Sequence, residues 1–446
     1  MEHLFILDFV LPPFLLLIIF LHCSRIKSKY AKTHEEYNYY ARALGIKIFG
    51  ATAFLLVYLF YYGGGDTINY FESAVTINKL MFKNFSEFVT FYSGNFDLKS
   101  ASFFDHETGT PIYSLADHAA IFTCKFYTPI VLVSGFSFVT STILAAVISF
   151  TGLWKLYRVF IYEFPNLKKQ LFIAIFMVPS VFFWGSGIMK DSIAISAVGW
   201  YLFALHSYFI RKRRRTIYIA ELVIASYLIL SIKPYILFAL LPGSILWLSN
   251  QTAQRFKNRL VRRVFSPLLL VIGAGLAYYA LNQIDEMLGL YKVDSVTERA
   301  VIVNRDMQMS YYGGKSFSLG DYDANISGLL SVAHKAVFAA LFRPTIIDAQ
   351  NAVMLFSALE NAYLLMLTIV LLIRLKFFGF FRFIGEHPLL MFAVLFSLFF
   401  SFSVGVSISN FGSLVRLRIP ALPFFVSSLF IIRSLYEKKY NVKMRI

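Results

Sequence analysis

The chain has 446 residues, of which 58% are hydrophobic, 18% aromatic and only 15% charged, and its formal net charge at pH 7 is +17. Soluble domains carry about a quarter charged residues, so this composition excludes a soluble globular enzyme, a disordered tail and a small disulfide framework. Long apolar runs satisfy their backbone in lipid only as helices or closed barrels, and runs of about 20 residues fit helices. We therefore predict an all-α, polytopic helical membrane protein.

Apolar runs predict about eleven membrane-spanning helices. In chain order they cover residues 4–23, 44–62, 127–150, 171–186, 192–210, 216–232, 235–249, 265–283, 350–372, 388–407 and 415–432. Neither a repeat at a fixed period nor a separate soluble segment is evident, so we expect residues 1–446 to form a single integral membrane domain. The two long gaps, 63–126 and 284–349, predict two large loops, and loops of that length are uncommon unless they are functional.

The distribution of Lys and Arg predicts the orientation. These residues gather in alternate short loops, most densely in Arg211–Arg215, and in the tail that contains Lys438 and Lys439. The positive-inside rule places such segments in the cytoplasm. We therefore expect a multi-pass protein of a bacterial inner membrane, with the N-terminus and both long loops outside and the C-terminus inside. The positive charge then reflects topology and contact with membrane lipids, and we expect no nucleic-acid partner.

The first outer loop begins with Gly63-Gly64-Gly65, which is followed directly by Asp66 and shortly afterwards by Tyr70. Glycines at a helix exit permit a sharp turn and the close approach of a ligand. Asp66 has two interpretations: a solvated residue that caps a helix C-terminus or a turn, or a carboxylate at the mouth of a lipid-facing cavity that acts as a general base.

The rest of this loop has the pattern of two amphipathic helices. Phe71, Ala74, Ile77 and Met81 recur at spacings of three and four, and Asn84 and Glu87 have the spacing of a capping box. Such helices lie in the membrane interface with their apolar faces in lipid. We expect the loop to be ordered and to lie on the outer leaflet.

Three ionisable residues adjoin short apolar runs near the outer face. Lys190 and Asp191 follow run 171–186, where the turn is expected to dip inward; they could pair with each other, or Lys190 could contact a phosphate. Lys233 joins two runs that barely cross the hydrocarbon, so it should be recessed and needs an anionic partner, either a carboxylate or a bound phosphate.

The second outer loop offers further candidates. Asp321 and Asp323 could bind a divalent cation, although two carboxylates fall short of a full ligand set; we expect no other cofactor. Residues 327–341 look amphipathic and contain His334. Arg343, just before Pro344, suits a phosphate because its planar guanidinium binds oxyanions through two parallel hydrogen bonds.

Polar residues also occur within or beside the last spans. Glu360 and Asn361 lie near the middle of run 350–372, where either a structural hydrogen-bonded pair or a proton or substrate path is possible. Arg416 and Arg418 lie at the outer mouth of the final run, so an anionic partner is expected. On a regular helix they would point about 200° apart, so that only one would face a cavity; snorkelling to the headgroups is the alternative.

Together these features resemble the C-type membrane glycosyltransferases, which use polyprenyl-phosphate-linked sugars. In that superfamily an aspartate begins the first large outer loop, interfacial helices follow, and basic residues hold the carrier phosphate; Asp66, Arg343-Pro344 and Arg416-x-Arg418 are similar to these elements. Here, however, the aspartate follows the second span, and the usual second acidic motif has only Asp191 as a counterpart. The Gly-Gly-Asp66 segment with Tyr70 also resembles a segment of the multispanning polymerases of exopolysaccharide and O-antigen.

The resemblance implies an enzyme that takes a sugar from a lipid-linked donor and attaches it to a glycan or lipid-linked acceptor. It implies Asp66 and Asp191 as catalytic residues. It implies substrate-binding roles for Tyr70, Lys190, Lys233, His334, Arg343, Arg416 and Arg418. Two alternatives stay open: a polymerase that joins lipid-linked repeat units, and, from another class, a transporter or lipid flippase, which should show inverted repeats and broken helices near the midplane.

Overall fold

The computed structural model describes residues 6–113, 115, 117–253, 293–309, 316–442 and 444. Regular secondary structure in these residues is helical, apart from one isolated bridge between Ser316 and Asn410. The predicted all-α class is therefore confirmed for the described chain. The predicted span 265–283 and the Gly313-Gly314-Lys315 segment lie outside the described residues.

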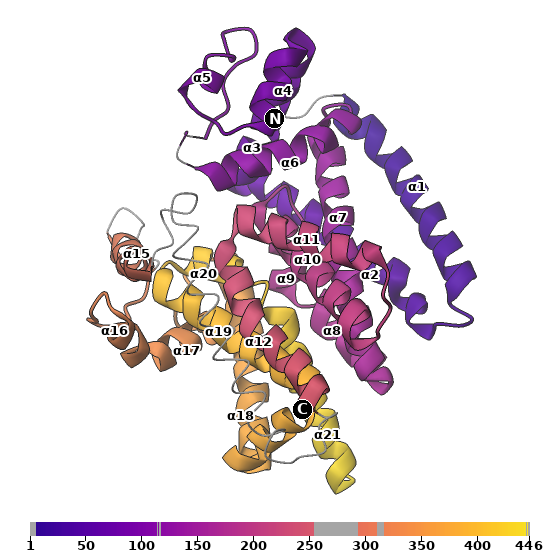
Figure 1. Cartoon of the computed structure of the whole chain (residues 1–446), viewed down its shortest axis with the longest axis vertical. Helices are drawn as coiled ribbons and strands as arrows, with labels where there is room; N and C mark the ends of the chain where they lie inside the picture. The colour runs from indigo at the N-terminus through magenta and orange to yellow at the C-terminus, as the bar shows by residue number, and fades with distance from the viewer. Residues whose placement is uncertain are drawn as a thin grey trace. The chain divides into compact units, whose positions relative to one another are not determined.

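The chain divides into two compact units, which are described separately. Unit 1 comprises Met1–Ile161, Val181–His206 and Arg215–Pro234, and unit 2 comprises Tyr162–Ser180, Ser207–Arg214 and Tyr235–Ile446. Figure 1 labels their helices along the chain.

Unit 1 is built mainly from its N-terminal helices, and three later helices complete it. These are α1 (Leu7–Tyr30), η1 (Glu35–Tyr39), α2 (Tyr40–Leu56), η2 (Val57–Tyr62), α3 (Asp66–Lys83), α4 (Phe85–Ser93), α5 (Leu98–Ala101), α6 (His118–Val133), most of α7 (Phe138–Glu163), most of α9 (Pro179–Trp184), α10 (Lys190–Leu205) and α11 (Thr216–Ile232). Helix α1 runs along the edge of the unit, and α4 and α5 form its tip beyond α3 (Figure 1).

Unit 2 is built mainly from the C-terminal half of the chain. Its helices are η3 (Pro165–Leu167), α8 (Lys168–Phe176), part of η4 (His206–Ile210), α12 (Pro234–Ala253), α15 (Val293–Asp306), α16 (Ile326–Ser331), α17 (Ala333–Phe342), α18 (Ala352–Glu386), α19 (Pro388–Ser407), α20 (Phe411–Leu417) and α21 (Leu422–Tyr440). Aromatic rings fill its core: the Phe396 ring lies 4.8 Å from that of Phe424 and 5.6 Å from that of Phe400.

Six helices of the described chain are long and apolar enough to span a membrane: Leu7–Tyr30, Glu35–Tyr62, Phe138–Glu163, Lys190–Ile210, Ala352–Lys376 and Pro388–Ser407. A seventh span arises if Phe411–Leu417 and Leu422–Tyr440, which are bent by 69°, are counted together. Shorter apolar helices cover His118–Val133, Thr216–Ile232, Pro234–Ser249 and Ala333–Phe342. The chain is thus a helical membrane protein by length and composition, while the number of about eleven spans and the outer placement of both loops stay predictions.

The prediction of a continuous span over residues 127–150 is wrong. A turn at Ser134–Ser137 separates α6 from α7, with Gly135 and Phe136 at φ +64° and +60°. Asp8 of α1 stabilises the start of α7, because its Oδ1 accepts hydrogen bonds from the Val139 amide at 2.9 Å and the Ser137 hydroxyl at 2.8 Å. Hydropathy does not register this turn, since apolar residues continue on both sides of it.

Run 171–186 likewise forms two short helices, α8 and α9, rather than one span. Helix α8 ends at Phe176, and α9 begins at Pro179, which lacks the amide hydrogen needed to continue a helix. The interruption was missed because the residues around the proline are apolar.

Two glycines bring α7 and α10 into close contact in unit 1. A Cβ atom at Gly152 would collide with the backbone of Ser196, and one at Gly199 would collide with the backbone of Gly152. Small residues at a helix crossing let the two backbones approach closely in membrane proteins. The Ser196 hydroxyl also donates to the Ile148 carbonyl at 2.9 Å. This crossing fixes α10, which carries Lys190 and Asp191 at its N-terminus.

Candidate functional site

Asp66 is the first residue of α3 and follows the helix Glu35–Tyr62, which is long and apolar enough to span a membrane. The chain reverses through Gly63 and Gly65, whose φ angles of +67° and +122° favour glycine. Gly63, not Asp66, is the residue that caps the preceding helix, so the C-cap interpretation of Asp66 is wrong. A carboxylate in the first turn of a helix interacts favourably with the helix dipole, and Asp66 is half-buried there.

A pair of tyrosines adjoins Asp66. The Tyr113 hydroxyl lies 3.4 Å from the Asp66 backbone oxygen, and the Tyr113 ring stacks on that of Tyr70 with 4.9 Å between centroids. Burial raises the pKa of Tyr113, and the negative charges of Asp66 and Asp117 raise it further. Tyr113 and Asp117 were not among the predicted site residues.

Asp117 connects this group to Lys190. Its Oδ1 accepts a hydrogen bond from the Ala120 amide at 2.9 Å, capping α6, and lies 3.3 Å from Lys190 Nζ. The Lys190 ammonium is also 6.0 Å from the centroid of the Tyr70 ring. The interpretation that Lys190 pairs with Asp191 is therefore wrong. Asp117 could have been found from the sequence as a helix-capping residue that directly precedes an apolar helix.

Asp191 instead forms an ion pair with Lys233. The Asp191 side chain is fully buried and that of Lys233 is 6% exposed. Lys233 terminates α11, and Asp191 lies in the first turn of α10. The expectation that Lys233 needs an anionic partner is confirmed, and the partner is a carboxylate of the same unit.

The segment between α9 and α10, together with Trp184 at the end of α9, is buried by protein throughout residues 184–189; that this turn dips into the membrane stays a prediction. Several helices of unit 1 hold it. The Tyr127 hydroxyl of α6 donates to the Met189 carbonyl at 3.0 Å and accepts from the Met189 amide at 3.2 Å. Lys47 Nζ of α2 and the Ser149 hydroxyl of α7 both donate to the Gly185 carbonyl, at 2.5 and 2.6 Å. Non-helical backbone is tolerated at membrane depth only when protein buries it in this way.

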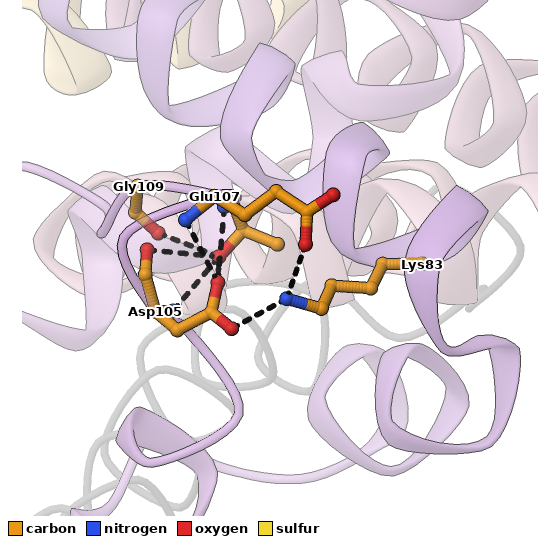
Figure 2. A network of polar contacts seen from close by, with 5 residues as sticks. Lys83, Asp105, Glu107 and Gly109 are labelled. Atoms are coloured by element: carbon orange, nitrogen blue, oxygen red, sulfur yellow. Dashed lines mark hydrogen bonds and ion pairs between the residues drawn. The ribbon is translucent and has the colours of Figure 1, made fainter.

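A polar network links the end of α3 to residues 105–109 of the predicted first outer loop (Figure 2). Lys83, at the end of α3, lies 2.5 Å from Asp105 and 2.6 Å from Glu107. The hydrogen bond from Lys83 and those from the Thr108 and Glu107 amides lower the pKa of Asp105 to about 2. Asn84 caps α4 by accepting from the Glu87 amide at 3.3 Å, as its position predicted. Helices α3, α4 and α5 occupy the first part of this stretch; its outer placement and its contact with the outer leaflet stay predictions.

Unit 2 holds the remaining predicted residues. Among them Arg343, whose side chain is 29% exposed, is more accessible than Arg418, whose side chain is fully buried. Its guanidinium binds Asp348 through two hydrogen bonds of 3.1 and 2.7 Å and lies 5.2 Å from the rings of Phe317 and Phe411. Burial acts to raise the pKa of Asp348, but hydrogen bonds from Arg343 and Thr345 outweigh it and lower that pKa.

Arg418 is fully buried at the bend between α20 and α21. Its guanidinium donates to the carbonyls of Ala340, Leu341 and Arg343 at 3.0–3.2 Å and to Asn361 Oδ1 at 2.5 Å, with Glu360 Oε1 at 3.5 Å. These contacts leave no donor facing an external phosphate other than Nε, which is itself buried. We therefore interpret Arg418 as a structural residue.

Glu360 and Asn361 thus form a structural group with Arg418, as the first of their two interpretations held. Glu360 Oε2 also accepts a hydrogen bond of 2.7 Å from the Ser180 amide. Arg416 is partly buried on α20, and His334 is exposed on α17. Within the described residues, no three His, Cys, Asp or Glu side chains come together in a way that could hold a metal ion.

No protein-family model, curated protein or solved structure matches this chain.

Proposed function

We propose that this chain is a glycosyltransferase that moves a sugar from a polyprenyl-phosphate-linked donor to an acceptor hydroxyl on the outer face of a bacterial inner membrane. The observation that carries the proposal is the position of Asp66. It lies where a membrane-spanning helix ends, half-buried, beside a group of Tyr113, Asp117 and Lys190. The group combines a carboxylate able to accept a proton with an ammonium able to stabilise an anion.

In the proposed reaction the acceptor hydroxyl oxygen attacks the anomeric carbon of the donor. The bond from that carbon to the phosphate oxygen breaks, and Asp66 accepts the hydroxyl proton. Negative charge then develops on the leaving phosphate, where the Lys190 ammonium would stabilise it by preorganised electrostatics. General-base assistance of this kind contributes about 10²–10⁴-fold to a rate.

Asp191 and Lys233 act as positioning residues in this scheme. Their ion pair is buried, so neither side chain is placed to contact a substrate directly. Because Asp191 adjoins Lys190 at the start of α10, the pair fixes the helix end that carries the Lys190 ammonium. Arg343 and Arg416 stay predicted phosphate ligands. Tyr70, predicted to bind substrate, is buried, so its ring is not placed to contact a substrate directly.

The test is to replace Asp66 with Asn in the host and to analyse surface glycans and lipid-linked intermediates by mass spectrometry. Asp105→Asn is the matched control, because it makes the same change at an exposed site of the same loop. We expect Asp66→Asn to lower sugar transfer about 10²–10⁴-fold with normal protein levels, and Asp105→Asn to leave it unchanged. Accumulation of complete lipid-linked repeat units with short glycans would instead identify a polymerase.

A transporter or lipid flippase is the second candidate, and one observation favours it. The last span is bent by 69°, and charged Arg418 and Glu360 are buried at that bend. Broken helices and buried charges occur at the substrate sites of many transporters. Normal glycans in the Asp66→Asn strain, together with substrate movement across vesicles that Glu360→Gln abolishes, would support this candidate.

A further inference from the structure

Unit 2 contains an open depression of about 400 Å³ that the proposed reaction does not use. Residues of α15, of α16 and of the segment that precedes α16 line it; Figure 1 shows α15 and α16 as neighbours. Its lining is almost entirely polar: Arg305, Asp321, Tyr322, Asp323, Ser327 and Ser331.

Local geometry fixes the walls of this depression. Gly328 completes the lining, and a Cβ atom there would collide with the backbone of Asp323, so only glycine lets α16 pack this closely. Asn325 caps α16 by accepting a hydrogen bond of 2.7 Å from the Gly328 amide. The Tyr322 hydroxyl donates to the Val406 carbonyl of α19 at 3.1 Å. The depression is therefore a built feature of the unit.

The charges of the lining restrict what can bind. Two carboxylates would repel a phosphate, and the Arg305 guanidinium would repel a metal ion. Ca²⁺ takes about six to eight oxygen ligands, and the described lining offers two carboxylates. Arg305 also lies near the Tyr322 phenol: burial raises the pKa of Tyr322, and the arginine opposes that effect.

A neutral molecule with several hydroxyl groups fits this lining better than an ion does. Each carboxylate accepts hydrogen bonds from hydroxyl groups, the guanidinium donates to hydroxyl or ring oxygens, and the two serines do both. Hydrogen bonds to ionised groups are about twice as strong as neutral ones. A volume of about 400 Å³ falls within the usual range of small-molecule sites.

We propose that this depression binds a neutral pyranose unit of the acceptor glycan. Its role as an acceptor site rests on the proposed transferase function, whereas sugar binding itself does not. Asp321, Asp323 and Arg305 provide the charge-assisted hydrogen bonds, and Ser327 and Ser331 the neutral ones.

The experiment is saturation-transfer-difference NMR on the purified full chain in lipid nanodiscs. The probe is an equimolar mixture of glucose, galactose, mannose, rhamnose and N-acetylglucosamine. Loss of one hydrogen bond to a charged group weakens binding about ten-fold or more. We expect at least one sugar to bind, and Asp323→Asn and Arg305→Gln to reduce its affinity by that factor.

Two controls make the result specific. Glu298→Gln changes an exposed side chain on the same helix as Arg305, outside the depression, and should leave binding unchanged. Asp66→Asn should also leave it unchanged, because that residue does not line the depression. No signal above that of empty nanodiscs, or equal signals in wild type and Asp323→Asn, would overturn the proposal. Sugar binding with unaltered glycans in the Asp66→Asn strain would instead refute the transferase function alone.

Discussion

Removing one member of the ion pair between Asp191 and Lys233 should destabilise the protein. Replacing both members with neutral residues should restore most of that stability. Asp191→Asn would leave the Lys233 ammonium, which is 6% exposed, without its carboxylate. Lys233→Met would leave the fully buried carboxylate without its ammonium. Breaking a buried ion pair by removing one partner costs about 3–5 kcal/mol, because an uncompensated charge stays buried. Each single variant should therefore lose stability on that scale.

The double variant should behave differently. Replacing both members of a buried pair by neutral groups is often neutral or stabilising. We expect Asp191→Asn with Lys233→Met to be about 3 kcal/mol more stable than either single variant, a difference of more than 100-fold in the unfolding equilibrium. Lys190→Met is the matched control, because its partner Asp117 is 43% exposed. Exposed pairs contribute about 0–1 kcal/mol.

The assay is equilibrium unfolding of the purified chain in mixed micelles, followed by far-ultraviolet circular dichroism. The wild type, the two single variants and the double variant of the Asp191–Lys233 cycle are compared with the Lys190→Met control. The reasoning would be refuted if the single variants were as stable as the wild type. It would also be refuted if the double variant lost the sum of the two single losses, since additive effects mean that the residues do not interact.

Two further predictions concern other charged groups. Arg418→Met should destabilise unit 2 by about 3–5 kcal/mol, because Glu360 stays buried and three carbonyls lose their donor; wild-type stability of the purified variant would contradict this. The contact of ionised Asp105 with Lys83 should stabilise the conformation of loop 105–109. This stabilisation should be complete above pH 3.8, the ordinary pKa of an aspartate, and should be lost as the pH falls through about 2, the pKa of Asp105 in the folded protein. The protection of the Thr108 amide from hydrogen exchange, taken relative to an unstructured peptide at the same pH, measures this. The pH dependence of that protection should vanish in Asp105→Asn, and its persistence in that variant would contradict the assignment.

The sequence predicted that charges near short apolar runs need partners, but it did not predict which ones. Lys233 was expected to meet an anion and does. Lys190 and Asp191 were considered a pair because they are adjacent, yet adjacent residues on a helix do not face each other. Lys190 instead contacts Asp117, and Asp191 contacts Lys233, over separations of 73 and 42 residues. Such distant contacts depend on helix packing, which one sequence does not reveal.

The two arginines at the last span show the same limit. Their spacing predicted that they would point in different directions, and Arg418 is indeed turned fully into the protein. What the spacing could not show is that the carbonyls at the end of α17 would be left without intrahelical partners and would bind this guanidinium. A basic residue expected to hold a phosphate thus stabilises a helix end.

The helical class was predictable because it follows from composition. The boundaries of the helices were harder to predict. Run 127–150 contains no charged residue, and its break depends on two positive φ angles and on the cap that Asp8 supplies from α1. Hydropathy averages over such a turn. The Gly63–Gly65 turn was predictable, because three successive glycines mark it in the sequence itself.

The central claim is that Asp66 is the general base of a sugar transfer, and the most direct measurement is the rate of that transfer in purified protein. Wild type, Asp66→Asn and Asp105→Asn are compared in nanodiscs, with lipid-linked donors extracted from the host and its glycan as acceptor. The account predicts a loss of about 10²–10⁴-fold for Asp66→Asn alone. Equal rates in all three proteins would contradict it.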